Sequence, residues 1–174
     1  LMGGKGVFTK VLDDALLEEK VDIAIHSFKD IPTETHDLLQ VSSILKRENP
    51  LDALVCRTNL DFLKNKNATI ATSSTRRKAQ WLSKYPNHTI VDIRGNVPTR
   101  IDKLKNSKWD ATILACAGLI RLDLQNEINQ SLDWMIGAPA QGAVAIMSLK
   151  KNNELNDVLK AINDPNTMIC TNIE

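Results

Sequence analysis

The stretch that decides the fold class runs from Ala68 to Ala115 and reads ATIATSSTRRKAQWLSKYPNHTIVDIRGNVPTRIDKLKNSKWDATILA. Short β-branched runs alternate with helical patterns in this stretch, and Asn96 and Pro98 suit the cap and first turn of a helix. The predicted strands are 69–72, 89–93 and 110–115, and the predicted helices are 76–84 and about 97–106. Strands that alternate with helices predict an α/β fold with mostly parallel sheets.

The remainder of the chain continues this pattern on both sides. Helices are predicted at 7–19, with Phe8, Val11, Leu12, Ala15 and Leu16 on one face, around Ile128 and Leu132, and along the stripe Leu155, Val158, Leu159 and Ile162. Strands are predicted at 21–26, 39–45, 53–57 and 143–149. In the helix at 76–84, Ala79 and Leu82 are expected to point inward.

Composition limits the classes of protein and partner. The 174 residues are 43% apolar and 25% charged, as in ordinary globular proteins, and no window reaches the 18 apolar residues of a membrane span. A net charge of +1 argues against nucleic acid or membrane partners, so any anion site must be local. Three cysteines without a Cys-x-x-Cys pair argue against a disulfide framework or a metal site, and they predict a reducing, cytoplasmic location.

Unusual polar residues follow three of the predicted strands, in the runs 27–33, 72–77 and 94–100. Ligands of open α/β sheets bind beyond the carboxyl ends of strands, where helix N-termini offer free N–H groups. Two of these runs carry the guanidinium pairs Arg76–Arg77 and Arg94–Arg100, which suit carboxylates or phosphates. Their coincidence predicts a polyanionic ligand, although a solvated helix start remains the alternative for an Arg–Arg pair.

Asp30 is the only carboxylate in the three runs. It could balance a cationic intermediate or move a proton, or it could be a turn residue ahead of Pro32. The Gly-rich run at 3–6 lacks the spacing of a phosphate-binding loop, so it is interpreted as a flexible, basic lid or simply a loop.

Seven motifs, taken in order, resemble the porphobilinogen deaminase (hydroxymethylbilane synthase) family. They are GGKGVF at 3–8, HSFKDIPT at 26–33, RENPLDA at 47–53, TSSTRR at 72–77, RGNVPTR at 94–100, AGLIRL at 117–122 and QGA at 141–143. No single run is decisive, but the ordered set is specific and covers nearly the whole chain.

The resemblance implies an α/β fold similar to type II periplasmic binding proteins, with two lobes of mixed, mostly parallel sheet and flanking helices. Lobe one would comprise residues 1–45 and 143–174 without its first strand, and lobe two residues 50–138. Hinges would lie near 46–50 and 137–142.

The resemblance also implies a transferase of tetrapyrrole (haem) biosynthesis. The family joins four porphobilinogen units head to tail, with release of ammonia, on a covalently held dipyrromethane. Asp30 matches the catalytic carboxylate. The residues implied in binding substrate and cofactor are Lys5, Ser27, Lys29, Thr72, Ser73, Ser74, Arg76, Arg77, Arg94, Gly95, Asn96, Arg100, Arg121 and Gln141. Porphobilinogen and the polypyrrole chain would be the partners, and the full-length protein would be a monomer.

Several departures from the family pattern affect the expected activity. The family's opening strand would precede Leu1, and the Gly-Gly-Cys turn that attaches dipyrromethane is absent. Cys170 falls where the family has a basic residue, and the hinge proline is displaced to Pro139. We therefore expect no bound dipyrromethane and no activity of this chain alone. The alternative function is a non-catalytic anion-binding module of the periplasmic-binding-protein type, which would have no use for a carboxylate such as Asp30.

Overall fold

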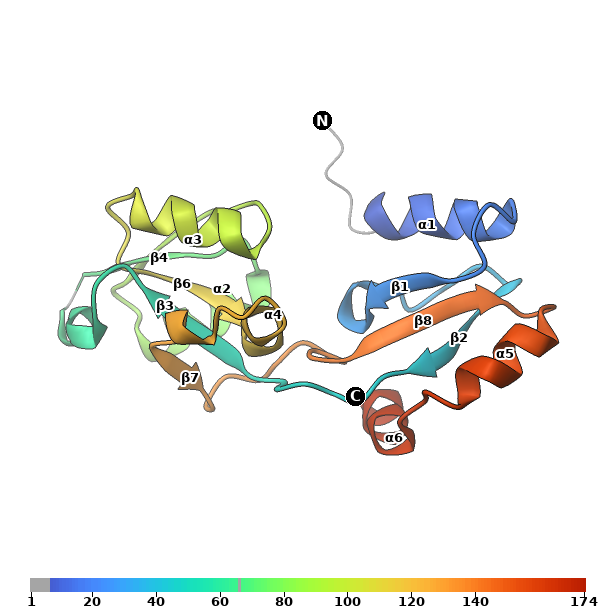
Figure 1. Cartoon of the computed structure of the whole chain (residues 1–174). Helices are drawn as coiled ribbons and strands as arrows, with labels where there is room; N and C mark the ends of the chain where they lie inside the picture. The colour runs from blue at the N-terminus through green and yellow to red at the C-terminus, as the bar shows by residue number, and fades with distance from the viewer. Residues whose placement is uncertain (1–6, 66) are drawn as a thin grey trace. The chain divides into compact units, whose positions relative to one another are not determined.

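The computed structural model describes residues 7–65 and 67–174, and the chain divides into two compact units (Figure 1). The first unit contains the described residues up to Glu48 together with Pro139–Glu174, and the second contains Asn49–Ala138. The chain therefore passes from the first unit into the second and returns.

The first unit is built on a three-stranded sheet in the order β1-β8-β2. Its elements are α1 (Val7–Leu17), β1 (Ala24–Ser27), the short 3-10 helix η1 (Phe28–Asp30), β2 (Leu39–Ile44), β8 (Val144–Leu149), α5 (Asn153–Lys160) and α6 (Pro165–Ile173). Helix α1 covers one face of the sheet, and α5 and α6 lie against the other (Figure 1). Leu16, Leu39 and Met147 are buried between α1 and the sheet.

The second unit is built on a five-stranded sheet in the order β5-β4-β6-β3-β7. Its strands are β3 (Asp52–Cys56), β4 (Thr69–Ala71), β5 (Thr89–Val91), β6 (Ala111–Ala115) and β7 (Gln130–Leu132). Its helices are η2 (Leu60–Lys64), α2 (Thr75–Lys84), α3 (Val97–Lys105), α4 (Cys116–Ile120) and η3 (Gln125–Glu127). Among the residues that the structure describes, no helix is long and apolar enough to cross a membrane.

Helices α2 and α3 cover opposite faces of this sheet. Successive residues of a strand point to opposite faces, so Leu54 of β3 packs in one cluster with Trp81 of α2, whereas Val55 packs in another with Leu104 of α3. All four side chains are at most 1% exposed. The helix starts are thereby held at the ends of strands β4 and β5.

The prediction of an α/β fold with mixed sheets and flanking helices is confirmed, but the expectation of mostly parallel pairing is wrong. Strand β4 pairs in parallel with β5 and β6, as the strand–helix alternation at 68–115 predicts. The other pairings of the described strands, β1–β8, β2–β8, β3–β6 and β3–β7, are antiparallel. They join segments far apart in the sequence, so local alternation did not reveal their direction.

The predicted helix around Ile128 and Leu132 is wrong. The short helix η3 ends at Glu127, and residues 130–132 form strand β7, which pairs with β3. The backbone N–H of Asn129 donates to the carbonyl of Leu54 and leads the chain into this pairing. A spacing of four between two apolar residues does not distinguish a helix from a turn followed by a strand, and the free edge of β3 decided the outcome.

The predicted inward face of α2 is also wrong. Ala79 is exposed and Leu82 only half-buried, whereas Arg77 and Trp81 are buried. Trp81 fills the core, and Arg77 points toward the carboxylate of Asp52 in the sheet. The ion pair rotates the polar residue inward, which a purely hydrophobic pattern does not anticipate.

Two other predicted apolar stripes are partly exposed. Val11 and Leu12 of α1 are 65% and 37% exposed, and Val158 and Ile162 are 69% and 50% exposed. In α5 the buried face includes Asn156 instead, because its side chain is bonded to two serine hydroxyls of the sheet. Polar contacts therefore set the rotation of α5, as they do for α2.

The core assignment of the second unit predicts a large difference between two isoleucines. Ile70 is fully buried in β4, whereas Ile136 is 78% exposed. We expect Ile70→Ala to lower the free energy of unfolding by about 2–5 kcal/mol and Ile136→Ala to change it by less than about 0.5 kcal/mol. Tryptophan fluorescence during urea unfolding measures this, because Trp81, Trp109 and Trp134, the three tryptophans of the chain, belong to this unit. Equal losses would contradict the assigned core.

Candidate carboxylate-binding site

One edge of the five-stranded sheet gathers the polar residues of the second unit. Strands β4, β5 and β6 run in the same direction, and each is followed at its carboxyl end by the start of a helix, α2, α3 or α4. Strand β3 runs in the opposite direction, so its first residue, Asp52, lies opposite Ala115 at the same edge. Helix N-termini at such an edge favour anionic ligands.

Asp52 binds both arginines of the first turn of α2. One carboxylate oxygen, Oδ1, accepts from Nε and Nη2 of Arg77 at 3.1 and 2.7 Å, and Oδ2 accepts from Nη1 of Arg76 at 2.7 Å. The Asp52 side chain is 0% exposed. Burial raises the pKa of Asp52, but the guanidinium groups of Arg77 and Arg76 outweigh burial and hold the pKa below its ordinary value of 3.8.

Arg100 brings a third guanidinium to this edge from α3. Burial lowers the pKa of Arg100, and so does the nearby positive charge of Arg77. Its Nε donates to the carbonyl of Gly95 at 2.7 Å, which folds the side chain back over its own loop. Arg76 and Arg77 thus share one carboxylate, Arg100 lies within electrostatic reach of Arg77, and the cluster of these four residues carries an excess of positive charge.

The loop after β4 uses its hydroxyl groups to fix its own shape. Ser74 caps α2 by accepting from the backbone N–H of Arg77, and the hydroxyl of Thr72 accepts from the N–H of Ser74. The Ser73 hydroxyl donates to the carbonyl of Ile93 and accepts from its N–H, both at 2.9 Å. Ser73 therefore fastens this loop to the loop that follows β5.

The loop after β5 is equally well determined. The predicted cap is confirmed: Oδ1 of Asn96 accepts from the N–H of Thr99 at 2.9 Å. Gly95 has φ +126°, and an added Cβ would lie 2.8 Å from a side-chain carbon of Thr99, so this position requires glycine. Lys103 donates to the carbonyl of Arg94 and closes the turn.

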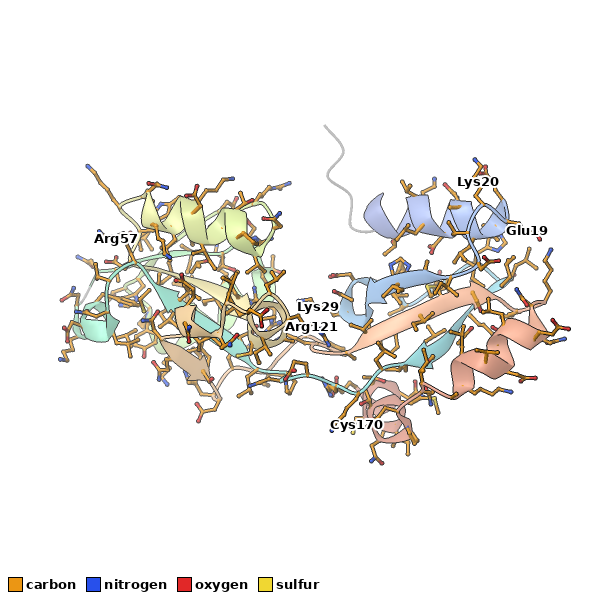
Figure 2. The ribbon with its side chains drawn as sticks, viewed as in Figure 1. Glu19, Lys20, Lys29, Arg57, Arg121 and Cys170 are labelled. Atoms are coloured by element: carbon orange, nitrogen blue, oxygen red, sulfur yellow. The ribbon has the colours of Figure 1, made fainter. Side chains whose placement is uncertain are left out.

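Two predicted arginines of this unit are exposed. Arg94 lies within the loop after β5, and Arg121 follows α4 (Figure 2). The structure therefore brings Thr72, Ser73, Ser74, Gly95 and Asn96 together in two joined loops with Arg76, Arg77 and Arg100. Asp52 is the member of this group that the sequence does not predict as a site residue; its only signal is an acidic residue at the head of an apolar strand.

The remaining predicted residues belong to the first unit. Ser27 ends β1, and Lys29 and Asp30 lie on the exposed turn of η1 (Figure 2). Gln141 is buried, and its carbonyl accepts from Nε of Arg47. Lys5 lies outside the described residues.

The cysteines of the second unit are unsuited to covalent attachment. Burial, together with the nearby carboxylate of Asp110, raises the pKa of Cys56 to about 11, and burial also raises the pKa of Cys116. Cys170 is exposed on α6 of the first unit (Figure 2). Within residues 7–65 and 67–174, no group of His, Cys, Asp or Glu side chains could hold a metal ion.

Comparison with known proteins assigns the family. The sequence profile described as "Porphobilinogen deaminase, dipyromethane cofactor binding domain" matches residues 1–157. The chain belongs to the porphobilinogen deaminase family. It is 43% identical to the porphobilinogen deaminase of Legionella pneumophila (strain Paris) in an alignment of 176 positions that covers 99% of this chain and 57% of that protein. It is also 43% identical to the porphobilinogen deaminase of Campylobacter jejuni subsp. doylei, covering 99% of this chain and 58% of that protein.

Solved structures of other proteins share the fold. A double mutant of the VFT2 domain of BvgS from Bordetella pertussis matches with a TM-score of 0.51 and 14% identity, covering 94% of this chain and 72% of that one. The probable amino-acid ABC transporter extracellular-binding protein ytmK from Bacillus subtilis matches with a TM-score of 0.52 and 20% identity, covering 89% and 68%. The fold of this porphobilinogen deaminase family member is therefore of the type II periplasmic-binding-protein-like class.

The ionised pair of Asp52 predicts how the stability of the second unit depends on pH. Replacing Asp52 by Asn leaves Arg77 buried without its counter-ion, and we expect a loss of about 3–5 kcal/mol near pH 7. Because the folded pKa of Asp52 lies below the unfolded value, its stabilisation is complete above the unfolded pKa of about 3.9 and is lost as the pH falls through the folded pKa.

Urea unfolding followed by tryptophan fluorescence tests this expectation. The difference between the original chain and Asp52→Asn should be constant from about pH 7 to about pH 5 and should shrink below about pH 4. A difference that grows on acidification would contradict an ionised, paired Asp52.

Proposed function

We propose that this chain is the polypyrrole-binding part of a porphobilinogen deaminase, a transferase of tetrapyrrole biosynthesis that joins four porphobilinogen units head to tail and releases ammonia. The chain spans about 57–58% of the length of the curated relatives it matches, so the activity belongs to the proposal. The observation that carries it is the cluster formed by Arg76 and Arg77 on one buried carboxylate, with Arg100 within electrostatic reach of Arg77.

The cluster suits the chemistry of the proposed substrate. Each porphobilinogen unit carries an acetate and a propionate, so the growing product is a polyanion. Guanidinium groups remain charged and bind carboxylates through paired hydrogen bonds. Arg76 and Arg100, which are half-buried at the carboxyl edge of the sheet, would bind these carboxylates beside the N-termini of α2 and α3.

Asp30 would perform the acid–base work. It is exposed on the η1 turn, so its carboxylate is accessible to a substrate. A carboxylate there would accept hydrogen bonds from pyrrole N–H groups and stabilise the cation that forms when ammonia leaves porphobilinogen. It would then assist the removal of the proton from the newly joined ring. Lys29 and Ser27 beside it would bind substrate carboxylates.

The described residues fit part of a dipyrromethane group. When bound, dipyrromethane supplies the primer to which pyrrole units are joined. Arg76, Arg100 and the exposed Arg94 would hold its acidic side chains. Its covalent attachment has no matching residue, because Cys56 and Cys116 are buried in the core and Cys170 lies on α6. We therefore propose that the chain alone does not tether the primer and does not turn over porphobilinogen.

The two crossings between the units would act as hinges, near 46–50 and 137–142. The second crossing contains two residues with positive φ, Ala140 at 57° and Gly142 at 90°. The backbone turns sharply at these two residues. Hinges of two-lobed binding proteins likewise consist of a few loop residues that absorb large changes in backbone dihedral angles.

A non-catalytic anion receptor is the second candidate, and the fold shared with an extracellular binding protein favours it. The exposed Asp30 argues against it, because the proposed enzyme needs an accessible carboxylate and an anion receptor does not.

Binding of uroporphyrin I, a tetrapyrrole with eight carboxylates, tests the carboxylate site. We expect the chain to bind it and Arg100→Met to weaken binding by about 10–100-fold, the effect of losing one charge-assisted contact. Fluorescence titration measures the affinity. Arg57→Met is the matched control, since Arg57 follows the opposite end of β3 (Figure 2) and its loss should leave binding within about twofold. Equal effects of the two variants would contradict a localised site.

The role of Asp30 predicts a separation of turnover from binding. The chain alone should release no ammonia from porphobilinogen. In a longer form of the protein that releases ammonia from porphobilinogen, Asp30→Ala should abolish this release, because the forming cation loses its counter-charge. Binding of uroporphyrin I should persist in the same variant. Turnover is measured as the ammonia released and as the porphyrin formed when the product is oxidised. Turnover by the chain alone would refute its proposed inactivity, and unchanged turnover in Asp30→Ala would favour the receptor.

A further inference from the structure

We infer that Asp52 is a positioning residue of the carboxylate site, and that it acts by holding Arg76 in the orientation in which that guanidinium meets a ligand. This inference rests on the proposed carboxylate-binding function. It assigns a role in anion binding to an acidic residue that does not itself contact the anion.

The two oxygens of Asp52 serve two different partners. Oδ1 is occupied by Nε and Nη2 of Arg77, and Oδ2 by Nη1 of Arg76. The carboxylate stands at the first residue of β3, a strand that is paired on both sides by β6 and β7. The sheet backbone therefore fixes the position of the carboxylate. The carboxylate in turn fixes the positions of both guanidinium groups relative to the sheet.

Arg77 is the anchored member of the pair. Its Nη1 donates to the carbonyl of Ile113 in β6 at 2.8 Å, so each of its three nitrogens donates to the sheet. Its side chain is 8% exposed, whereas that of Arg76 is 24% exposed. Arg77 thus fastens α2 to the sheet, and Arg76 is the more accessible member.

Arg76 is held from a second direction as well. Its Nη1 also donates to the carbonyl of Ile136, and the same carbonyl accepts from Gln80 one turn further along α2. Gln80 returns a bond by accepting from the N–H of Ile136 at 2.8 Å. The segment at Ile136 is thereby fixed to α2, so that Asp52 and Ile136 together hold one edge of the Arg76 guanidinium.

Without a carboxylate, this arrangement would be electrostatically unfavourable. Arg76 and Arg77 lie in the first turn of α2, where the helix dipole repels cations, and the positive charge of Arg77 contributes to lowering the pKa of Arg100. Asp52 offsets these repulsions from within the sheet. Removing its charge would release Arg76 from the position shared with Ile136.

A positioning role for Asp52 and a purely electrostatic role predict effects of opposite sign on anion binding. Removing a negative charge beside an anion site should strengthen anion binding if charge alone matters. If Asp52 positions Arg76, the loss of the carboxylate should weaken binding, because the anion loses a preorganised guanidinium.

The test uses the 174-residue chain and uroporphyrin I as probe, with the fold verified by circular dichroism. We expect Asp52→Asn to weaken binding by about tenfold or more, comparable with the loss of one charge-assisted contact. Asp61→Asn is the matched control: Asp61 is exposed and paired with Lys64, so its loss removes the same charge from the same unit without touching the arginines. Unchanged or tighter binding by folded Asp52→Asn would refute the inference.

A double-mutant cycle separates positioning from a general loss of structure. If Asp52 acts through Arg76, then Arg76→Met should weaken binding about tenfold in the original chain and little in Asp52→Asn, whereas Arg94→Met should have the same effect in both. Additive effects of Asp52→Asn and Arg76→Met would refute the inference.

A second variant serves if Asp52→Asn fails to fold. In Asp52→Asn/Arg77→Met no buried guanidinium loses its counter-ion, and Arg76 is retained. The effect of Arg76→Met on binding is then compared between the Arg77→Met chain and the Asp52→Asn/Arg77→Met chain. Failure of the original chain to bind uroporphyrin I would refute the proposed carboxylate site instead, so the two failures are distinguishable.

Discussion

The burial of the Asp52 carboxylate in the five-stranded sheet is the constraint on which the second unit depends. A charge removed from water is stable only with close counter-charges and hydrogen bonds, and here Arg76 and Arg77 supply both. These ion pairs fix the rotation of α2 about its axis, so that Arg77 and Trp81 point inward. The same interaction places the N-terminus of α2 at the carboxyl edge of the sheet, so one ion-pair network sets both the packing and the chemistry of the site.

The two loops of the site are held together by side-chain hydrogen bonds to the backbone. Ser73 joins the loop after β4 to Ile93, and Asn96 caps α3 where Gly95 turns the chain. Several hydroxyl and amide side chains with an expected role in substrate binding are therefore engaged in shaping the loops. Loops that are already ordered lower the entropic cost of binding a ligand.

The fold and the chemistry carry different information about function. The type II periplasmic-binding-protein-like fold is shared with binding proteins at 14–20% identity, so it does not distinguish a receptor from an enzyme. Family membership rests on the ordered motifs and on 43% identity to porphobilinogen deaminases. The proposed enzyme and the alternative anion receptor differ in their use of a single exposed carboxylate, that of Asp30, beside Lys29 on the η1 turn.

The sequence by itself determined the α/β class, the family, the strand–helix unit at 68–115 and the Asn96 cap, because these depend on local periodicity, capping chemistry and motif order. Only the tertiary structure decided the antiparallel pairings of β3 and β8, the strand at 130–132 and the buried faces of α1, α2 and α5. It alone assigned Asp52 to the arginines, which lie 24 and 25 positions away in the chain. These features depend on which distant segments meet in space, and a pattern read over neighbouring residues contains no information about such encounters.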